Sequence, residues 1–240
     1  GKESKGSKDR QMSETNHVIV IGAGAAGMLA AIAAAREGAA VELWEQNEKP
    51  GKKLFITGKG RCNLTNACDM DALFASVRSN ARFLYSAFYG FTNQDAMAFF
   101  EEEGLKIKTE RGERVFPLSD KSADVLDTLR RSMRRAGAEV HLNTEVKDLI
   151  VRDGAAKGLI LADQTRVEGD AVIVATGGLS YPVTGSTGDG YRFAKEAGHK
   201  VTDCIPSLTP FNIREDFVKE LQGLSLKNVE LRIYNGKKEV

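Results

Sequence analysis

The chain has 240 residues, of which 42% are hydrophobic and 28% charged, a composition typical of a soluble globular protein with a sizeable core. Its 34 basic and 33 acidic side chains give a net charge of +1, which excludes the strong positive excess of a general nucleic-acid binder. No apolar run approaches the roughly 20 residues that span a bilayer, and no signal peptide precedes the first apolar segment. We therefore expect a cytoplasmic protein without a membrane or nucleic-acid partner.

The first predicted unit along the chain is a strand, a glycine-rich turn, a helix and a second strand. His17–Ile21 is a short β-branched apolar run, which favours a strand buried in a parallel sheet. After the turn Gly22–Gly27, the alanine-rich segment Met28–Arg36 predicts a helix, and Val41–Glu45 predicts the second strand. This order is typical of a Rossmann-type dinucleotide-binding βαβ unit.

The turn between this strand and helix carries the G-x-G-x-x-G pattern. We expect Gly22 to permit the tight turn, Gly24 to let the backbone approach a pyrophosphate, and Gly27 to allow close packing of the helix on the strand. The N-terminus of the helix that follows then offers free N–H groups to the phosphates. A glycine-rich turn without a ligand is the alternative, and the strand and helix on either side make it much the weaker one.

The second strand ends in an acidic residue. Glu45 lies about 20 residues after the glycines, where dinucleotide-binding folds place the carboxylate that binds ribose hydroxyls. A carboxylate there repels a 2′-phosphate. The pattern therefore predicts FAD or NAD rather than NADP.

The segment that follows is rich in glycine and in cations. In a simple NAD domain we would expect a helix here, but Lys49–Asn66 has the composition of a loop. Gly58 and Gly60 allow close backbone approach, and Lys53 and Arg61 can meet phosphate charge. A solvated basic loop is the alternative interpretation.

The middle of the chain predicts helices and then a small antiparallel meander. Helix caps are expected at Asp69 or Asn80 and at Thr92 or Asn93, and a helix with a buried stripe is expected over Ser122–Ala136. Extended structure is expected over Val140–Val151, with a hairpin at Asp153–Gly154 and strands at Lys157–Leu161, Thr165–Val167 and Asp170–Val174. The last of these is apolar and leads into Gly177 and Gly178, which suits a return to the parallel sheet.

Three longer motifs make the assignment more specific. They are Gly51–Asn66, which contains Gly-Arg-Cys-Asn, Glu110–Pro117, and Ala175–Pro182 followed by Thr187–Gly190. With the glycine turn, they resemble the bacterial FAD-dependent flavoprotein family of glutathione-reductase-type fold that includes bile-acid enone reductases and aminoacetone oxidase. The resemblance covers about residues 16–240. It implies an α/β fold: a Rossmann-type FAD-binding domain with a parallel sheet and an antiparallel meander, plus the start of an inserted, β-rich second domain.

The resemblance also implies which residues hold FAD. The glycine turn would cradle the pyrophosphate, Glu45 would bind the adenosine ribose, and the backbone of Val146 would contact adenine. Lys53 and Arg61 would line the phosphate and ribityl region, and Tyr181 and the loop Thr184–Gly190 would lie toward the flavin side. The full expected set is Gly22, Gly24, Ala25, Ala26, Gly27, Glu45, Gln46, Lys53, Gly60, Arg61, Cys62, Asn63, Val146, Ala175, Thr176, Gly177, Gly178 and Tyr181.

The chain is shorter than this family's pattern. Residues 1–11 are typical of a tag remnant. Residues 12–205 would form an FAD-binding domain that lacks the final segment with which the chains of this family return to it after an inserted domain. Residues 206–240 would begin the inserted substrate-side domain. There, Leu226–Tyr234 predicts a strand and Asn235–Gly236 a hairpin turn, with only four residues left for the returning strand.

The function implied is that of an FAD-dependent oxidoreductase acting on a small organic substrate, with NAD(P)H or O₂ as the second substrate. One alternative is an O₂-dependent oxidase of a small amine such as aminoacetone. An alternative of another class is an RNA-modifying or non-catalytic flavin-binding protein. The sequence identifies no catalytic residue.

Cysteine usage adds one further expectation. The chain has three cysteines, and an odd number without a pairing pattern fits a reducing compartment. Cys62 and Cys68 are too far apart for the usual C-x₂₋₄-C zinc ligand pair, so no metal site is expected. Cys62 has no resolving cysteine beside it, which disfavours a redox-active thiol.

Overall fold

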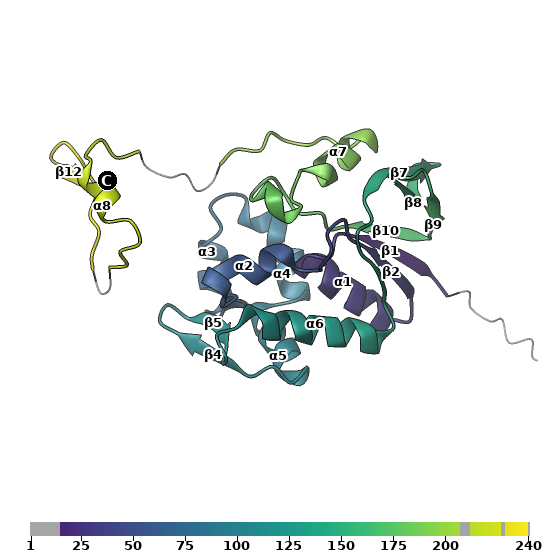
Figure 1. Ribbon diagram of the computed structural model, residues 1–240, viewed down its shortest axis with the longest axis horizontal. Helices are drawn as coiled ribbons and strands as arrows, with labels where there is room; N and C mark the ends of the chain where they lie inside the picture. Colours follow the sequence, from purple (N-terminus) through teal and green to yellow (C-terminus); the bar gives the residue numbers. More distant parts are fainter. Residues whose placement is uncertain (1–14, 207–211, 227–228, 240) are drawn as a thin grey trace, which may run out of the picture. The chain divides into compact units, whose positions relative to one another are not determined.

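The computed structural model describes residues 15–206, 212–226 and 229–239 (Figure 1). The chain divides into two compact units, Gly1–Val201 and Thr202–Val240. The expected tag remnant, residues 1–11, lies outside the described residues. None of the helices in the described part is both long and apolar enough to cross a membrane.

A four-stranded parallel sheet forms the centre of the first unit. Its strands lie in the order β10 (Ala171–Val174), β1 (His17–Ile21), β2 (Ala40–Trp44) and β6 (Glu139–His141). β1 is buried because a neighbour pairs with each of its edges, α1 packs on one face, and residues of β7, β8 and α7 pack on the other, which explains its continuous apolar sequence. This confirms the predicted parallel sheet and the return of β10 to it.

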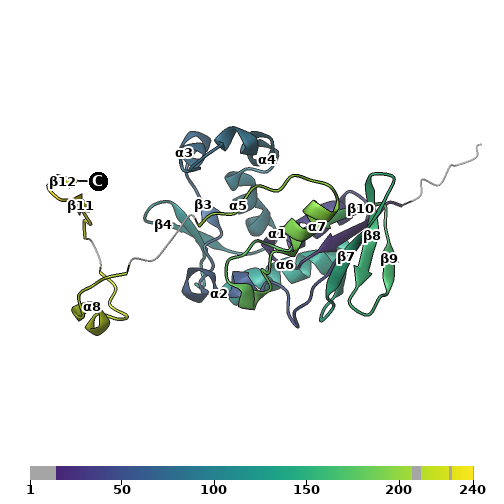
Figure 2. The same cartoon turned by 90° about the horizontal axis from the view of Figure 1, so that it is seen from above.

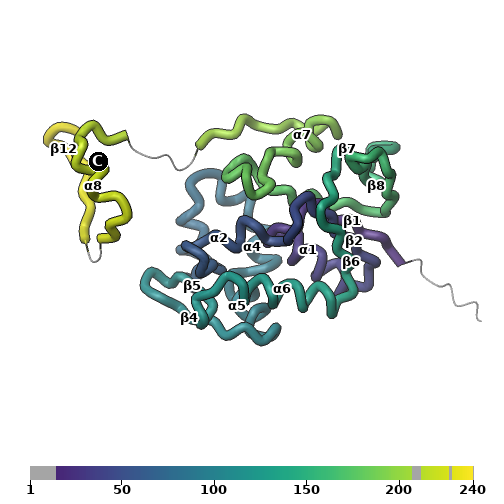
Figure 3. The backbone as a smooth tube through the Cα atoms, in the orientation of Figure 1, coloured from purple at the N-terminus to yellow at the C-terminus, as the bar shows by residue number. Residues whose placement is uncertain are grey.

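Two helices build the main core against this sheet. Helix α1 (Ala25–Arg36) connects β1 to β2, as the tube view shows (Figure 3), and it packs on α6 (Ser122–Ala136). The α6 residues Val125, Leu129 and Met133 are almost completely buried. The stripe predicted from their four-residue spacing is therefore the face that α6 turns to the core, and Gly137 ends the helix in a left-handed conformation.

The predicted meander is also present. Strands β7 (Val146–Arg152), β8 (Ala155–Leu161) and β9 (Arg166–Glu168) form an antiparallel sheet, which lies beside β10 in Figure 2. Asp153 and Gly154 both have positive φ, as a tight two-residue hairpin requires.

A second antiparallel sheet was not predicted. It has the order β3 (Thr65–Asn66), β5 (Arg114–Pro117) and β4 (Ile107–Glu110). Its strands are only two to four residues long, and polar and apolar residues alternate in them only weakly. The sequence therefore lacks the alternating pattern by which a half-buried strand is recognised.

The loop expected over Lys49–Asn66 is wrong in part, because Lys52–Gly60 forms helix α2. The helix is broken inside: Thr57 is extended, and Gly58 and Lys59 are left-handed. Its first turn packs near α6, and that tertiary contact supports a helix that glycine content alone disfavours.

The remaining helices of this unit are short. Asp69 caps α3, and Thr92 caps α5 in a capping box with Asp95, in agreement with the cap predictions. The elements are α3 (Met70–Ala75), η1 (Ala81–Leu84), α4 (Tyr85–Gly90), α5 (Asn93–Glu102), η2 (Pro182–Thr184) and α7 (Asp189–Glu196).

The second unit has little regular structure among its described residues. It contains helix α8 (Phe217–Glu220) and a hairpin of β11 (Tyr234–Asn235) and β12 (Lys238–Glu239) that turns at Gly236. The strand expected over Leu226–Tyr234 is wrong for 229–233, which form no strand, while 227–228 lie outside the described residues. The expected hairpin is present with a short returning strand, but its turn residues are Gly236 and Lys237, because Asn235 pairs with Lys238.

Candidate functional site

A cavity of about 470 Å³ opens where β1, β2 and β10 end, at their carboxyl ends. This edge of a parallel sheet is where ligands of doubly wound folds bind. Most of the expected cofactor residues line the cavity: Gly22, Gly24, Ala25, Ala26, Glu45, Gln46, Lys53, Cys62, Asn63, Val146, Ala175, Thr176 and Gly177. Segments from five parts of the chain therefore meet at one site.

The three glycines of the turn have different surroundings. Gly22 has a φ of +98°, and a Cβ on it would lie 2.6 Å from the carbonyl oxygen of Ala175. A Cβ on Gly27 would overlap the carbonyl oxygen of Gly22, so this residue allows α1 to pack on the turn. A Cβ on Gly24 would meet nothing within 4 Å. Of the three, Gly24 alone leaves free space in front of the backbone, as close approach of a ligand requires.

The start of α1 is open to the same cavity. Gly24 is the N-cap and supplies no side-chain acceptor, while Ala25 and Ala26 line the cavity. The first N–H groups of a helix have no partner within the helix, and the helix dipole places partial positive charge there. This twelve-residue helix thus presents an anion site toward the cavity, and the pyrophosphate of a dinucleotide fits its chemistry.

Glu45 is 7% exposed and lines the cavity at the end of β2. One carboxylate oxygen accepts the backbone N–H of Ala23 at 2.7 Å. The other accepts the backbone N–H and the side-chain amide of Asn47, at 2.9 and 2.6 Å. A carboxylate offers about four acceptor positions, so one remains for a ribose hydroxyl while these three bonds persist.

The connection after β2 also holds a segment that comes much later in the chain. Gln46 donates to the carbonyl oxygen of Gly185, and Asn47 donates to that of Thr184. The ammonium of Lys53 donates to the Ser180 carbonyl oxygen at 2.7 Å and to the Ser186 hydroxyl at 2.6 Å. Sequence reasoning missed Asn47, because only the fold brings it to the cavity, and it placed Ser186 only as part of the Thr184–Gly190 loop.

Cys62 and Asn63 form another part of the cavity wall. Cys62 is 3% exposed, with a φ of +60° that non-glycine residues seldom adopt. Burial raises the pKa of its thiol, against a smaller lowering by the Thr57 hydroxyl. This is the opposite of the low pKa that a reactive cysteine needs. The side-chain amide of Asn63 lies 3.0 Å from the carbonyl oxygens of Val115 and Thr65 and joins this wall to β3 and β5.

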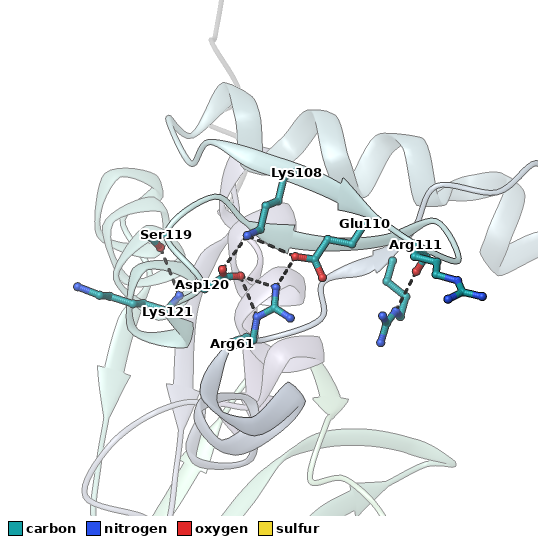
Figure 4. Close-up of polar contacts among 8 residues, drawn as sticks. Arg61, Lys108, Glu110, Arg111, Ser119, Asp120 and Lys121 are labelled. Atoms are coloured by element: carbon teal, nitrogen blue, oxygen red, sulfur yellow. Dashed lines mark hydrogen bonds and ion pairs between the residues drawn. The ribbon is translucent and has the colours of Figure 1, made fainter. Parts of the chain in front are cut away.

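The structure places Arg61 outside the cavity lining, in the cluster drawn in Figure 4. Its guanidinium donates twice to Asp120, at 2.8 and 2.6 Å, and once to Glu110 at 2.5 Å. It also lies over the ring of Phe116, 4.1 Å from the centroid. Lys108 bonds the other Asp120 oxygen at 2.7 Å. Arg61 and Lys108 thus pair with two carboxylates of the protein itself, whereas the expected partner of Arg61 was a phosphate of the cofactor.

In the charge cluster of Arg61, Lys108, Glu110 and Asp120, the two cations lower the pKa of both carboxylates. Lys108 and Arg61 lower the pKa of Asp120, and Arg61 with Lys108 lowers that of Glu110. A lowered carboxylate pKa contributes stability above the unfolded pKa and loses it as pH falls through the folded pKa. The loss should begin as pH falls past the ordinary values of 4.5 for Glu110 and 3.8 for Asp120, and it should continue below them.

We therefore expect Asp120→Asn to unfold at lower urea than the parent at pH 7, and this gap to narrow as pH falls to about 3, because Asp120 in the unfolded chain takes up its proton there before the folded protein does. Urea midpoints of both proteins across this range measure it. The gap should be small, because these side chains are a quarter or more exposed. A gap that is the same at both ends of the range would contradict the expectation.

Four other expected residues lie outside the cavity lining. Gly27 packs against the turn, as described, and Gly60 has a positive φ of 82° at the end of α2. A Cβ on Gly178 would lie 3.2 Å from the hydroxyl of Tyr191. Tyr181 is 67% exposed. Among the described residues, no group of three or more His, Cys, Asp or Glu side chains is arranged to hold a metal ion.

The comparisons with known proteins agree with this arrangement. Residues 16–238 match the family described as HI0933-like protein Rossmann domain. The chain is 38% identical over 205 residues to 3-dehydro-bile acid delta(4,6)-reductase of Clostridium scindens, covering 83% of this chain and 48% of that protein. It is 33% identical over 220 residues to ribosomal RNA dihydrouridine synthase of Haemophilus influenzae, covering 90% and 54%. The chain thus spans about half the length of these curated relatives.

A solved structure shows the same fold. That of 3-ketosteroid-delta4-(5alpha)-dehydrogenase from Rhodococcus jostii RHA1 has a TM-score of 0.54 at 17% identity, over 71% of this chain and 48% of that one. Likeness at this identity concerns the fold alone. The family match, by contrast, covers nearly the whole chain. A dinucleotide cofactor also fits the glycine turn, the N-terminus of α1 and the carboxylate at the end of β2. The chain belongs to the HI0933-like Rossmann family of FAD-dependent flavoproteins.

Proposed function

We propose that this chain binds FAD and forms the cofactor-binding part of an oxidoreductase that saturates a carbon–carbon double bond conjugated to a carbonyl. The observation that carries the proposal is the cavity at the ends of β1, β2 and β10, where free space at Gly24, the start of α1 and the carboxylate of Glu45 meet. These are the features that bind a pyrophosphate and a ribose in one ligand.

The reaction class rests on two relatives. One is named a delta(4,6)-reductase of a 3-dehydro bile acid and the other a dihydrouridine synthase. Both names describe the reduction of a double bond conjugated to a carbonyl, in a steroid or in a uracil base. Bound FAD in its reduced form supplies the hydride for such a step. The balancing proton comes from an acid or from water.

The chain's own residues would bind and orient the cofactor. The N–H groups of Ala25 and Ala26 would hold the pyrophosphate, and Glu45 would accept from the ribose. Val146, at the start of β7, would contact the adenine through its backbone. The chain carries one dinucleotide fingerprint, so NAD(P)H would bind only transiently when it reduces the flavin.

RNA is the second candidate substrate. Two relatives are named ribosomal RNA dihydrouridine synthases, so the family does not support the expectation that nucleic acid takes no part. The nearly balanced charge of this chain favours a small organic substrate over RNA. Mixing the reduced, FAD-loaded protein without oxygen with an enone steroid or with a uridine-containing RNA separates the two, because the true substrate reoxidises the flavin.

Binding of FAD has a built-in optical probe. Trp44 is the single tryptophan of the chain, and it lines the cavity in a stack with the His141 ring, 3.8 Å between centroids. Because flavin absorbs where tryptophan emits, titration with FAD should quench Trp44 fluorescence in a saturable way. Trp44→Phe should lose the signal and still retain flavin after gel filtration. A parent protein that neither quenches nor retains FAD would overturn the proposal.

A further inference from the structure

The segment Ser180–Ser186, called the strap below, lines the cofactor cavity with its last three residues. It follows β10 and contains η2, and Figures 1 and 2 show it beside α2. Within the strap, the backbone N–H and the hydroxyl of Thr184 both donate to the Tyr181 carbonyl oxygen, and Gly185 N–H donates to that of Pro182. The strap is therefore a hydrogen-bonded turn with a defined shape of its own.

Apolar packing contributes little to holding the strap in place. Its large apolar side chains are exposed, Tyr181 by 67% and Val183 by 79%, and the adjacent Leu179 by 56%. Among its residues, Ser186 is the buried one, at 6%. Since exposed side chains gain almost nothing from the hydrophobic effect, polar contacts have to position the strap.

Those contacts come from the connection between β2 and α2. Gln46, Asn47 and Lys53 donate four hydrogen bonds to it, three to backbone oxygens and one to the Ser186 hydroxyl. Lys53 bonds both ends of the strap, and its bonds of 2.7 and 2.6 Å are the shortest of the four. A charged donor also makes the stronger bonds, so Lys53 is the main fastening.

The strap is also connected to the proposed ribose ligand. The amide of Asn47 donates to Glu45 at 2.6 Å and to the Thr184 carbonyl oxygen at 3.3 Å. Glu45 has one acceptor position left, whereas a ribose diol donates from two hydroxyls. Binding both hydroxyls would compete with Asn47 for Glu45 and so disturb a strap contact.

We infer that Lys53 is a positioning residue that fastens the strap across the cofactor cavity, and that the strap must be released for FAD to enter or leave. The inference rests on the proposed function. It assigns Lys53 an action through Ser180 and Ser186 rather than a direct contact with the phosphates.

The fastening is tested first without cofactor. Hydrogen exchange of the strap amides is measured in the parent, Lys53→Met, Ser186→Ala and the control Lys49→Met, which removes an exposed neighbouring charge. Exchange in residues 180–186 should rise about tenfold in Lys53→Met, less in Ser186→Ala and not at all in Lys49→Met, while β1 stays protected. Unchanged strap exchange in Lys53→Met would overturn the fastening.

The second test asks whether the strap must be released for FAD to enter or leave. The protein is mixed with FAD in a stopped-flow instrument, and binding is detected by the quenching of Trp44 fluorescence. Association and dissociation should both be faster in Lys53→Met, by about tenfold, and the dissociation constant should change less than either rate. A direct phosphate ligand predicts faster dissociation with slower or unchanged association, and that result would overturn the inference. If the parent binds no FAD at all, the proposed function fails, and the exchange experiment still decides whether Lys53 fastens the strap.

Discussion

Gly24→Val is expected to give a folded protein that has lost FAD binding. The backbone of Gly24 has a φ of −72° and a ψ of −177°, which valine adopts without strain. Apart from Gly24 itself, its chain neighbours and the backbone of its own helix, no atom of the residues that the structure describes lies within 4 Å of the position that a Cβ would take. The added side chain would therefore fill the space where the pyrophosphate approaches the backbone, and it would disturb little else.

Gly27→Val is the matched control, since the same change three residues later should act on folding instead. Its Cβ would overlap the Gly22 carbonyl oxygen, and α1 would have to move away from the sheet. Overpacking typically costs about 1–3 kcal/mol, and an overlap with backbone belongs at the upper end of that range. Circular dichroism and urea unfolding report the fold, and flavin content after purification reports binding. A folded Gly24→Val protein that retains flavin would contradict the assignment of the phosphate site.

Glu45→Ala is expected to weaken FAD binding by about 1.5–3 kcal/mol, the value of hydrogen bonds to a charged acceptor, or roughly 10- to 100-fold in the dissociation constant. The variant should also unfold more easily. The N–H of Ala23, buried against the carboxylate at 2.7 Å, would lose its acceptor. Titration of Trp44 fluorescence measures the affinity, and urea unfolding measures the stability.

Glu45→Gln separates the two effects. Glutamine keeps one oxygen that can accept from Ala23, so stability should largely return. It lacks the second acceptor and the charge, so FAD should still bind more weakly than to the parent. Equal dissociation constants for the parent and both variants would show that Glu45 does not hold the ribose.

The first βαβ unit was predictable because its signals are local. The apolar strand, the three glycines and the acid at the end of β2 are all within 29 residues of His17, and each constrains its own neighbourhood. Gly22 and Gly27 serve packing and Gly24 faces free space, as the glycine pattern indicates. The same holds for the hairpin at Asp153–Gly154, which depends on two residues.

The partners of the cations were not predictable, because they come from distant parts of the chain. Arg61 lies in a glycine-rich segment typical of phosphate binding, but a guanidinium binds carboxylate as readily as phosphate. Its carboxylate partner Asp120 is 59 residues away. Lys53 likewise meets Ser186, 133 residues later. The identity of such partners follows from the tertiary fold and not from the segment that carries the cation.

The order of the strands in the parallel sheet affects how the protein can be made. β1 is synthesised well before one of its two neighbours, β10, which begins about 150 residues later at Ala171. Until Ala175 has been synthesised, the turn at Gly22 has nothing to pack against on that side. Pairing between such distant segments is slow to form, and it leaves a strand edge exposed on the nascent chain. This edge of β1 would stay unpaired until β10 has been made, and FAD could assist folding only after Ala175 has been synthesised.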